Sequence, residues 1–256
     1  MNVAILGAGN VATVLSALIR KAGHKIVQVV SRNAVNAKEL ADKCHTESGL
    51  LSDDNFAEAD LYIIALTDNA IGKIGQYKSL QNKFLVHTAG SVSMDVLKDV
   101  TSSYGVMYPL QTLSKNANEI PYIPFLVGAN NSENVELLMD FAASLSDDVS
   151  FTTDEERLKY HVAAVFVGNF TNHLLAMGEV FCEKERLNFQ TLIPLINQVT
   201  HNAIHESAFK MQTGPAIRED IVTLNKHLQA LSAHTEWKYI YLKLSESILK
   251  IHQKTK

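Results

Sequence analysis

The sequence predicts an α/β protein in which a domain with a mostly parallel sheet is followed by an all-α domain. Over residues 1–152, short apolar runs alternate with helical patterns, a rhythm typical of parallel βαβ units. A glycine-rich turn follows the first apolar run. From residue 153 onward the pattern is helical, with no convincing strand. We therefore expect two domains, at residues 1–152 and 153–256.

The expected strands are mostly continuous apolar runs, as in strands that helices cover on both faces. They lie at residues 3–6, 26–30, 61–66, 84–87, 105–108 and 125–128. In the first expected helix, apolar residues recur at i, i+3, i+4, i+7 and i+11 from Val11, and Gly23 ends it. Thr153 and Glu156 form a capping box, which predicts a long helix. Further helices are expected around residues 189–209, 217–232 and 235–252.

Composition excludes several classes of protein. The chain has 23 Lys and Arg against 27 Asp and Glu, a balance that makes nucleic acid and membrane surfaces poor partners. Its two cysteines, Cys44 and Cys182, form neither a CxxC motif nor a four-thiolate zinc site, so we expect a cytoplasmic protein. Residues 1–19 carry no charge, but the glycine turn interrupts them, so we interpret them as a buried strand and not an export signal.

The glycine turn carries the clearest functional signal. Gly7-x-Gly9-x-x-Ala12 lies between an expected strand and an expected helix, which is the context of a dinucleotide-binding fingerprint. Gly7 allows the tight turn, Gly9 lets the backbone approach a pyrophosphate, and Ala12 permits close packing of helix on sheet. The helix N-terminus, with Asn10 and Val11, offers free amides to phosphate. We predict a Rossmann-type cofactor domain; the alternative is a tight turn without a ligand.

The end of the second expected strand indicates which dinucleotide binds. An NAD site places Asp or Glu there for the ribose 2′-hydroxyl, whereas this strand runs into Ser31 and Arg32. Arg32 can pair with a 2′-phosphate and Ser31 can donate to it, so NADP(H) is the predicted cofactor. Alternatively, Arg32 is only a solvated loop charge.

Two later strand ends complete the expected cleft, because ligands of open α/β sheets bind outside the carboxyl ends of the strands. Leu66 and Thr67 end one strand, and His87 and Thr88 end the next. Their backbone and small side chains are expected to line the ribose and nicotinamide. A Ser-His-Asp hydrolase is not favoured, because no GxSxG motif is present.

The long helix after Thr153 carries candidate substrate-binding residues. At 100° per residue, one strip of the helix is formed by His161, Gly168, Asn172 and Glu179. Asn169 is rotated about the helix axis by about 80° from this strip. Such a strip is often only a solvated face. Here the neighbouring residues 162–167 are strongly apolar, so we expect a buried helix whose polar groups need partners, such as a substrate.

A second polar cluster follows the break at residues 212–215. Asp220, Thr223 and His227 stand at i, i+3 and i+7, which predicts one face of a helix that begins at the Gly-Pro break. With Arg218 they point to a small anionic substrate; alternatively, Arg218 and Asp220 form a surface ion pair. His201 and His205 have a metal-chelating spacing but no evident third ligand, so no metal is expected.

Motifs along nearly the whole chain occur together in one known family. They are Gly7-x-Gly9, residues 61–69, His87-Thr88-Ala89-Gly90, Tyr108-Pro109-Leu110-Gln111-Thr112, Tyr160-His161-x-Ala163-Ala164 with Asn169-Phe170, Thr213-Gly214-Pro215-x-x-Arg218-x-Asp220, and His227-Leu228. The sequence resembles a bacterial family of Rossmann-like oxidoreductases whose C-terminal helical domain has no assigned function. Similar architectures include ketopantoate reductase, pyrroline-5-carboxylate reductase and deazaflavin-dependent NADP reductases.

The resemblance implies NADP binding, an active site between the domains and a homodimer formed through the helices. Some members are similar to an alternative ketopantoate reductase. The family tends to have His where Tyr108 stands and Gly where Glu219 stands; we interpret Glu219 as favouring a helix. Ordinary ketopantoate reductases use a helical Lys as the acid, whereas the comparable position here is His161.

These residues suggest an NADP(H)-dependent reductase of a small oxo acid or imine. Hydride would be delivered near His87 and Thr88, Asn169 would orient the substrate, and Arg218 would bind its carboxylate. His161 or the face with Asp220 and His227 would supply the proton. The alternatives are a non-catalytic NADP-binding sensor or assembly protein, and a deazaflavin-dependent NADP reductase.

Overall fold

The computed structural model describes residues 1–253, and the chain divides into two compact units, Met1–Phe170 and a second that starts at Thr171. The expected boundary at residue 152 lies directly after the last strand of the sheet. The first unit extends beyond that boundary because it includes the helical turns up to Phe170. Within the described residues, no helix is both long and apolar enough to cross a lipid bilayer.

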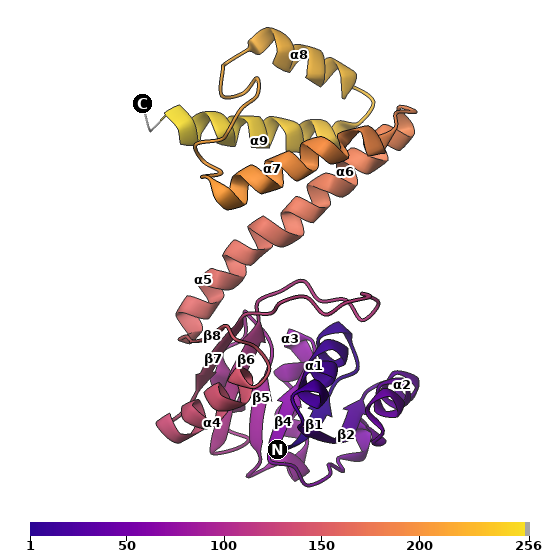
Figure 1. Cartoon of the computed structure of the whole chain (residues 1–256), viewed down its shortest axis with the longest axis vertical. Coiled ribbons are helices and arrows are strands. Elements are labelled where there is room, and N and C mark those ends of the chain that lie inside the picture. The colour runs from indigo at the N-terminus through magenta and orange to yellow at the C-terminus, as the bar shows by residue number, and fades with distance from the viewer. Residues whose placement is uncertain (254–256) are drawn as a thin grey trace. The chain divides into compact units, whose positions relative to one another are not determined.

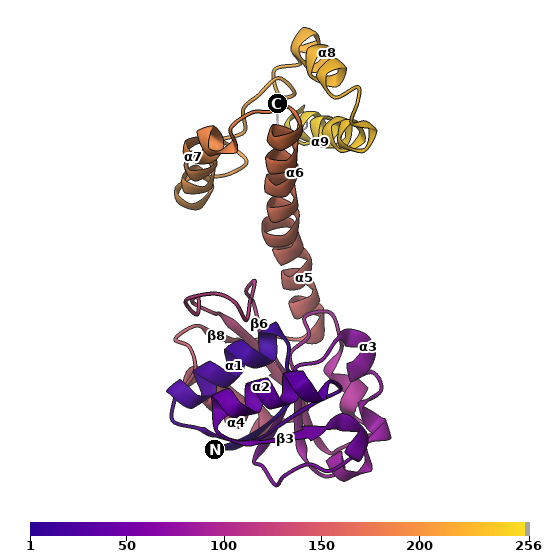
Figure 2. The same cartoon turned by 90° about the vertical axis from the view of Figure 1, so that its right-hand side faces the viewer.

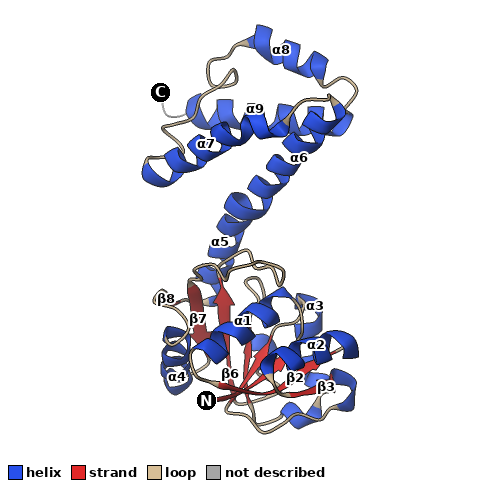
Figure 3. Cartoon of the chain, turned by 45° about the vertical axis from the view of Figure 1, so that its right-hand side comes forward, coloured by secondary structure: helices blue, strands red, loops and turns tan. Residues whose placement is uncertain are grey.

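The first unit is built on an eight-stranded sheet in the order β3-β2-β1-β4-β5-β6-β7-β8 (Figures 1 and 3). Neighbouring strands run parallel except β6 and β7, which are antiparallel. The strands are β1 Asn2–Leu6, β2 Lys25–Ser31, β3 Glu47–Leu50, β4 Leu61–Ile64, β5 Phe84–His87, β6 Ser103–Pro109, β7 Phe125–Ala129 and β8 Val149–Phe151. This is the predicted Rossmann-like, mostly parallel sheet.

Helices cover both faces of this sheet. Val3 and Ile5 of β1 pack into one core cluster with α1 (Asn10–Lys21), α2 (Ala34–Cys44) and α4 (Ser132–Ala143). Ala4 and Leu6 face the opposite cluster, which includes residues from α3 (Asp68–Ile71) and short 3-10 turns. Because both faces of the sheet are buried, side chains that point to either face are apolar. The strands are therefore continuous apolar runs.

All six predicted strands are present, and two further strands, β3 and β8, have no apolar signal in the sequence. β3 is the outer strand at one edge of the sheet, paired only with β2, and its first two residues are exposed. β8 has three residues at the other edge, two of them exposed. Short edge strands bury too little side-chain surface to require an apolar run.

The predicted helix ends are confirmed at two places. After α1, Gly23 has φ +83°, its amide donates to the Arg20 carbonyl, and the next amide donates to the Ile19 carbonyl. At the start of α5 (Asp154–Ala164), the Glu156 amide donates to Thr153 Oγ1 (3.2 Å), and the Thr153 amide donates to the Glu156 carboxylate (2.9 Å). The predicted capping box is therefore formed.

The second unit consists of helices, as predicted: α6 Thr171–Lys184, α7 Ile193–His205, α8 Ile221–Ala230 and α9 Thr235–Gln253. Few of its side chains are buried: within residues 171–253, only Cys182 and Ala216 are buried hydrophobic residues. The predicted burial of the helix over residues 162–167 is wrong for the single chain, because Val162 is 50% exposed and Val167 is 76% exposed. These helices have apolar faces that no described residue covers.

The interpretation of Glu219 as a helix-favouring residue is also wrong. Its φ is +55°, in the left-handed region, within the tight turn that precedes α8. Left-handed backbone brings Cβ close to the carbonyl oxygen, and glycine avoids this contact. The predicted helix therefore begins later than the Gly-Pro break, at Ile221.

Replacing Glu219 by glycine is expected to stabilise the protein by about 0.5–1 kcal/mol, because it relieves the left-handed backbone. The gain is reduced by loss of the hydrogen bond that Gln253 Nε2 donates to Glu219 Oε1 (3.2 Å). Urea unfolding of the full chain measures it. Glu219→Ala loses the same hydrogen bond and keeps the strained backbone, so it should be no more stable than wild type; equal gains in both variants would contradict the explanation.

Candidate active site

The glycine turn between β1 and α1 has the geometry of a dinucleotide-binding turn. Gly7 has φ +131°, and an added Cβ would lie 2.1 Å from the Ala65 carbonyl oxygen, so only glycine fits. At Gly9 an added Cβ would meet no atom within 4 Å, so the space over the turn is open. Gly9 is the N-cap of α1 and has no side chain to accept from the first-turn amides. Those amides are left for an anionic ligand.

Asn10, the first residue of α1, connects the turn to a distant loop. Its side-chain oxygen accepts a hydrogen bond from the Lys115 amide (3.1 Å). Lys115 lies in the long connection between β6 and β7, which passes over the start of α1 (Figures 1 and 2). The Asn10 side chain therefore holds this loop, while the amides of Asn10 and Val11 stay in the first helical turn.

The other predicted cofactor residues follow the neighbouring parallel strands. Ser31 is the last residue of β2 and is buried, and Arg32 beside it is exposed. Leu66 and Thr67 follow β4, and Thr67 is the N-cap of α3. The strands β2, β1, β4 and β5 are adjacent and parallel, so their carboxyl ends share one edge of the sheet. The structure thus brings the predicted cofactor residues to one edge.

His87 is the last residue of β5, the strand next to β4 at this edge, and Thr88 follows it. His87 has no exposed surface, and its Nδ1 accepts from the Ala89 amide (3.2 Å). Burial, with a smaller contribution from the nearby Arg157 charge, lowers the pKa of His87 to about 4, so the ring is neutral at neutral pH. Thr88 is buried as well, and its amide donates to the Ile64 carbonyl (3.3 Å). At these two positions the backbone is the part that can face a ligand.

Next to β5, a cavity of about 370 Å³ opens at the end of β6. Two predicted catalytic residues, His161 and Asn169, line it together with Tyr108. Tyr108 Oη and His161 Nδ1 are hydrogen-bonded at 2.9 Å. The other lining residues are Leu110, Gln111, Thr112, Tyr160, Ala163, Ala164, Val167 and Gly168. The cavity is largely apolar with a few converging polar groups, which is typical of a small-molecule site.

Comparisons with known proteins assign the chain to a family. Residues 2–90 match the family described as "NADP oxidoreductase coenzyme F420-dependent", and residues 123–248 match a domain of unknown function, DUF2520. A solved structure from Bacteroides fragilis, assigned as an NADP oxidoreductase, is 35% identical and covers 97% of this chain and 98% of its own, with a TM-score of 0.88. No curated protein matches the chain.

The chain belongs to the family of NADP oxidoreductases that includes the Bacteroides fragilis protein. Two more distant structures share the fold. Pyrroline-5-carboxylate reductase from Streptococcus pyogenes is 14% identical, covers 98% of each chain and has a TM-score of 0.61. A reductive aminase from Aspergillus terreus, solved with NADPH and ethyl-5-oxohexanoate, is 18% identical and covers 99% of this chain and 94% of its own, with a TM-score of 0.65.

In the oxidoreductase, a π-helical turn places Asn169 at the cavity. Residues Val165–Phe170, directly after α5, form this turn. A π turn holds more residues than an α turn, so the 100° rotation assumed for the polar strip does not hold beyond Ala164. His161, Gly168 and Asn169 line the cavity, whereas Asn172 belongs to the second unit. Single π turns inside helices are frequent at functional sites.

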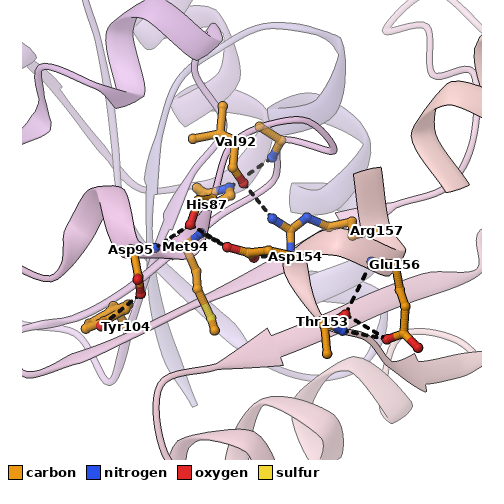
Figure 4. A network of polar contacts seen from close by, with 11 residues as sticks. His87, Val92, Met94, Asp95, Tyr104, Thr153, Asp154, Glu156 and Arg157 are labelled. Carbon is orange, nitrogen blue, oxygen red and sulfur yellow. Dashed lines mark hydrogen bonds and ion pairs between the residues drawn. The ribbon is translucent and has the colours of Figure 1, made fainter. Parts of the chain in front are cut away.

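A buried ion pair fixes the start of α5 on the loop that follows β5 (Figure 4). Arg157 is 1% exposed; it pairs with Asp154 (2.7 Å) and donates to the Val92 carbonyl (2.5 Å). Asp154 accepts from the Met94 amide (3.1 Å) and the Ser93 hydroxyl. These contacts join α5, which carries His161, to the segment after His87 and Thr88.

Arg218 and Asp220 lie in the second unit. Arg218 is exposed in the turn before α8. Asp220 is the N-cap of α8, accepting from the Thr223 amide (3.0 Å) and hydroxyl (2.7 Å). These hydrogen bonds hold the pKa of Asp220 below its usual value, so it is an ionised acceptor at neutral pH. His227 is hydrogen-bonded through Nδ1 to the Tyr241 hydroxyl (2.7 Å).

Proposed function

We propose that this oxidoreductase uses NADP(H) to reduce a small oxo acid or imine. The observation that carries the proposal is the order of strand ends along one edge of the sheet. Arg32 follows β2, the glycine turn follows β1, Thr88 follows β5, and the cavity lies at the end of β6. An extended dinucleotide with its 2′-phosphate at Arg32 and its pyrophosphate at the turn would end beside that cavity.

The residues present fit this cofactor. The open space at Gly9 and the uncapped amides of α1 suit a pyrophosphate, and the exposed Arg32 suits a 2′-phosphate. When bound, the cofactor supplies a hydride. The chain would supply a proton from His161, orientation by Asn169 and a charge for the substrate carboxylate from Arg218. We prefer His161 to Asp220 as the acid, because Asp220 is held ionised by its cap bonds.

The relatives' names support an imine or carbonyl substrate. Pyrroline-5-carboxylate reductase and reductive aminase share this fold, and each name refers to chemistry at a carbon–nitrogen bond. A ketopantoate-like oxo acid is the second class to test, since it offers a carbonyl and a carboxylate to the same groups.

Arg32→Ala is expected to weaken NADPH binding by about tenfold or more while leaving NADH binding nearly unchanged, because only NADPH has the 2′-phosphate. Titration of the cofactor's fluorescence measures both affinities. Arg20→Ala, in the last turn of α1, is the matched control and should change neither. Unchanged NADPH affinity in the Arg32 variant would overturn the 2′-phosphate assignment.

His161→Ala is expected to lower the rate of NADPH oxidation by at least about tenfold, because proton transfer would lose its donor. The assay follows NADPH absorbance with ketopantoate and a cyclic imino acid as substrates. NADPH affinity should stay within about twofold of wild type if only chemistry is affected. An unchanged rate would show that His161 is not the proton donor. Binding of NADPH without turnover of any oxo acid or imine would favour a sensor or assembly protein.

One observation favours electron transfer to a deazaflavin as a second candidate. The family that matches residues 2–90 is described as F420-dependent. The match covers the cofactor domain and not the cavity residues of α5. NADPH oxidation that requires added coenzyme F420, with none on oxo acids or imines, would select this alternative.

We further propose that the oxidoreductase works as a homodimer formed through its helices. Large apolar side chains on three helices of the second unit are more than half exposed: Leu195, Val199 and Ile204 on α7, Val222 on α8 and Tyr239 on α9. Exposed apolar surface on this scale marks an interface. Light scattering should give twice the mass of one chain. The double variant Val199→Glu, Ile204→Glu should lower the measured mass towards that of a single chain.

A further inference from the structure

Tyr108 and His161 form a hydrogen-bonded pair that the sequence motifs do not explain. Tyr108 is in β6 and His161 is in α5, and Tyr108 Oη lies 2.9 Å from His161 Nδ1. The rings meet edge to face, with centroids 5.7 Å apart and an interplanar angle of 77°. Both residues line the cavity. The contact therefore links the sheet directly to the proposed proton donor.

The backbone after β5 lies directly beneath this pair. A Cβ added at Gly90 would lie 2.7 Å from His161 Nδ1 and 2.9 Å from Tyr108 Cζ. Both distances are too short for a real contact, so only glycine allows the two rings to sit there. The proposed function places the reactive end of the cofactor at this same strand end, next to Thr88. The pair is thus close to the position where a substrate would receive hydride.

Tyr108 has a proton that it can donate to His161 in this contact. Burial raises the pKa of Tyr108, so the phenol keeps its proton at neutral pH and is able to donate it to His161 Nδ1. A neutral imidazole that accepts at Nδ1 carries its own proton on Nε2. Within residues 1–253, Nε2 of His161 has no hydrogen-bond partner in the structure. It is the donor that remains for a ligand in the cavity.

We propose that Tyr108 is a positioning residue that holds His161 in the Nε2–H form and renews its proton during turnover. This inference rests on the proposed function. As the substrate carbon receives hydride, its nitrogen or oxygen takes the proton from His161 Nε2. In the same step His161 Nδ1 takes the phenol proton. After the product leaves, water in the cavity protonates Nε2, and Nδ1 returns its proton to the Tyr108 oxygen. Two electrons enter the substrate with the hydride, and each protein group ends as it began.

The test compares Tyr108→Phe with Tyr104→Phe, which removes a hydroxyl from another tyrosine of β6 that does not line the cavity. Nitrogen-15 NMR of the cofactor-free protein should show His161 mainly as the Nε2–H tautomer in the wild type and in Tyr104→Phe. In Tyr108→Phe a mixture of tautomers is expected. With NADPH and a substrate, kcat should fall about tenfold in Tyr108→Phe alone, with KM within about twofold.

Gly90→Ala provides a second route to the same result, because its methyl group would push the two rings apart. It should give the same mixture of tautomers with Tyr108 intact. Identical His161 spectra in the wild type and in Tyr108→Phe would overturn the proposal, as would equal kcat values in the two phenylalanine variants. If the wild type turns over no substrate, the proposed function fails, and the NMR comparison still decides whether Tyr108 holds His161.

Discussion

Replacing Asp154 by asparagine is expected to lower the free energy of unfolding by about 3–5 kcal/mol. The change leaves the guanidinium of Arg157, 1% exposed, in the interior without a negative partner. A buried charge without a counter-charge loses its hydration and gains little in return. The Asp154 carboxylate also anchors the Met94 amide and the Ser93 hydroxyl, which adds to the cost (Figure 4). Urea unfolding of the full chain measures the effect.

A double-mutant cycle separates the ion pair from general disruption. Arg157→Met should cost less than Asp154→Asn, because Asp154 is 30% exposed and can regain water. The double variant should be more stable than Asp154→Asn alone, since it no longer buries an unpaired charge. Glu155→Gln, which breaks the exposed pair with Lys159 on the same helix, should change stability by less than about 0.5 kcal/mol. A double variant no more stable than Asp154→Asn would contradict this account.

The cofactor half of the site is predictable from the sequence because its signals are local. Gly7 and Gly9 are needed by the turn they form, and Arg32 directly follows the strand that positions it. A parallel sheet then aligns the strand ends without further information. The six predicted strands needed only their own apolar runs, while β3 and β8 formed by pairing at the sheet edges.

The catalytic half depends on contacts between distant residues and is therefore less predictable. Tyr108 and His161 are 53 residues apart, and neither shows in the sequence that the other is its partner. The pairing of Arg157 with Asp154 has the spacing of an ordinary helix-surface ion pair, so the sequence does not reveal that Arg157 is buried. The π turn at Val165–Phe170 also has no composition signal, and it changes which asparagine faces the cavity.

Lowering the pH from about 6.5 to about 4 is expected to reduce the stability of the first unit by up to about 3 kcal/mol through His87 alone. The pKa of His87 is lowered to about 4 by burial and by the charge of Arg157, against weaker opposing effects of Asp154 and Asp68. Between these pH values the unfolded chain binds a proton at His87 and the folded chain does not. As far as His87 is concerned, the free energy of unfolding has its full value above pH 6.5. It decreases as the pH falls to 4, by up to about 1.4 kcal/mol per pH unit.

His87→Gln tests this expectation, because glutamine has no titratable group. Its free energy of unfolding at neutral pH should be lower than that of the wild type, and it should change less between pH 6.5 and 4. Asp154, whose pKa is lowered, does not produce the same change between pH 6.5 and 4. Protonation of carboxylates lowers the free energy of unfolding mainly at and below about pH 4. His45→Gln, at an exposed position after α2, is the control and should keep the wild-type slope. The same slope in the wild type and in His87→Gln would show that His87 is not the group that titrates.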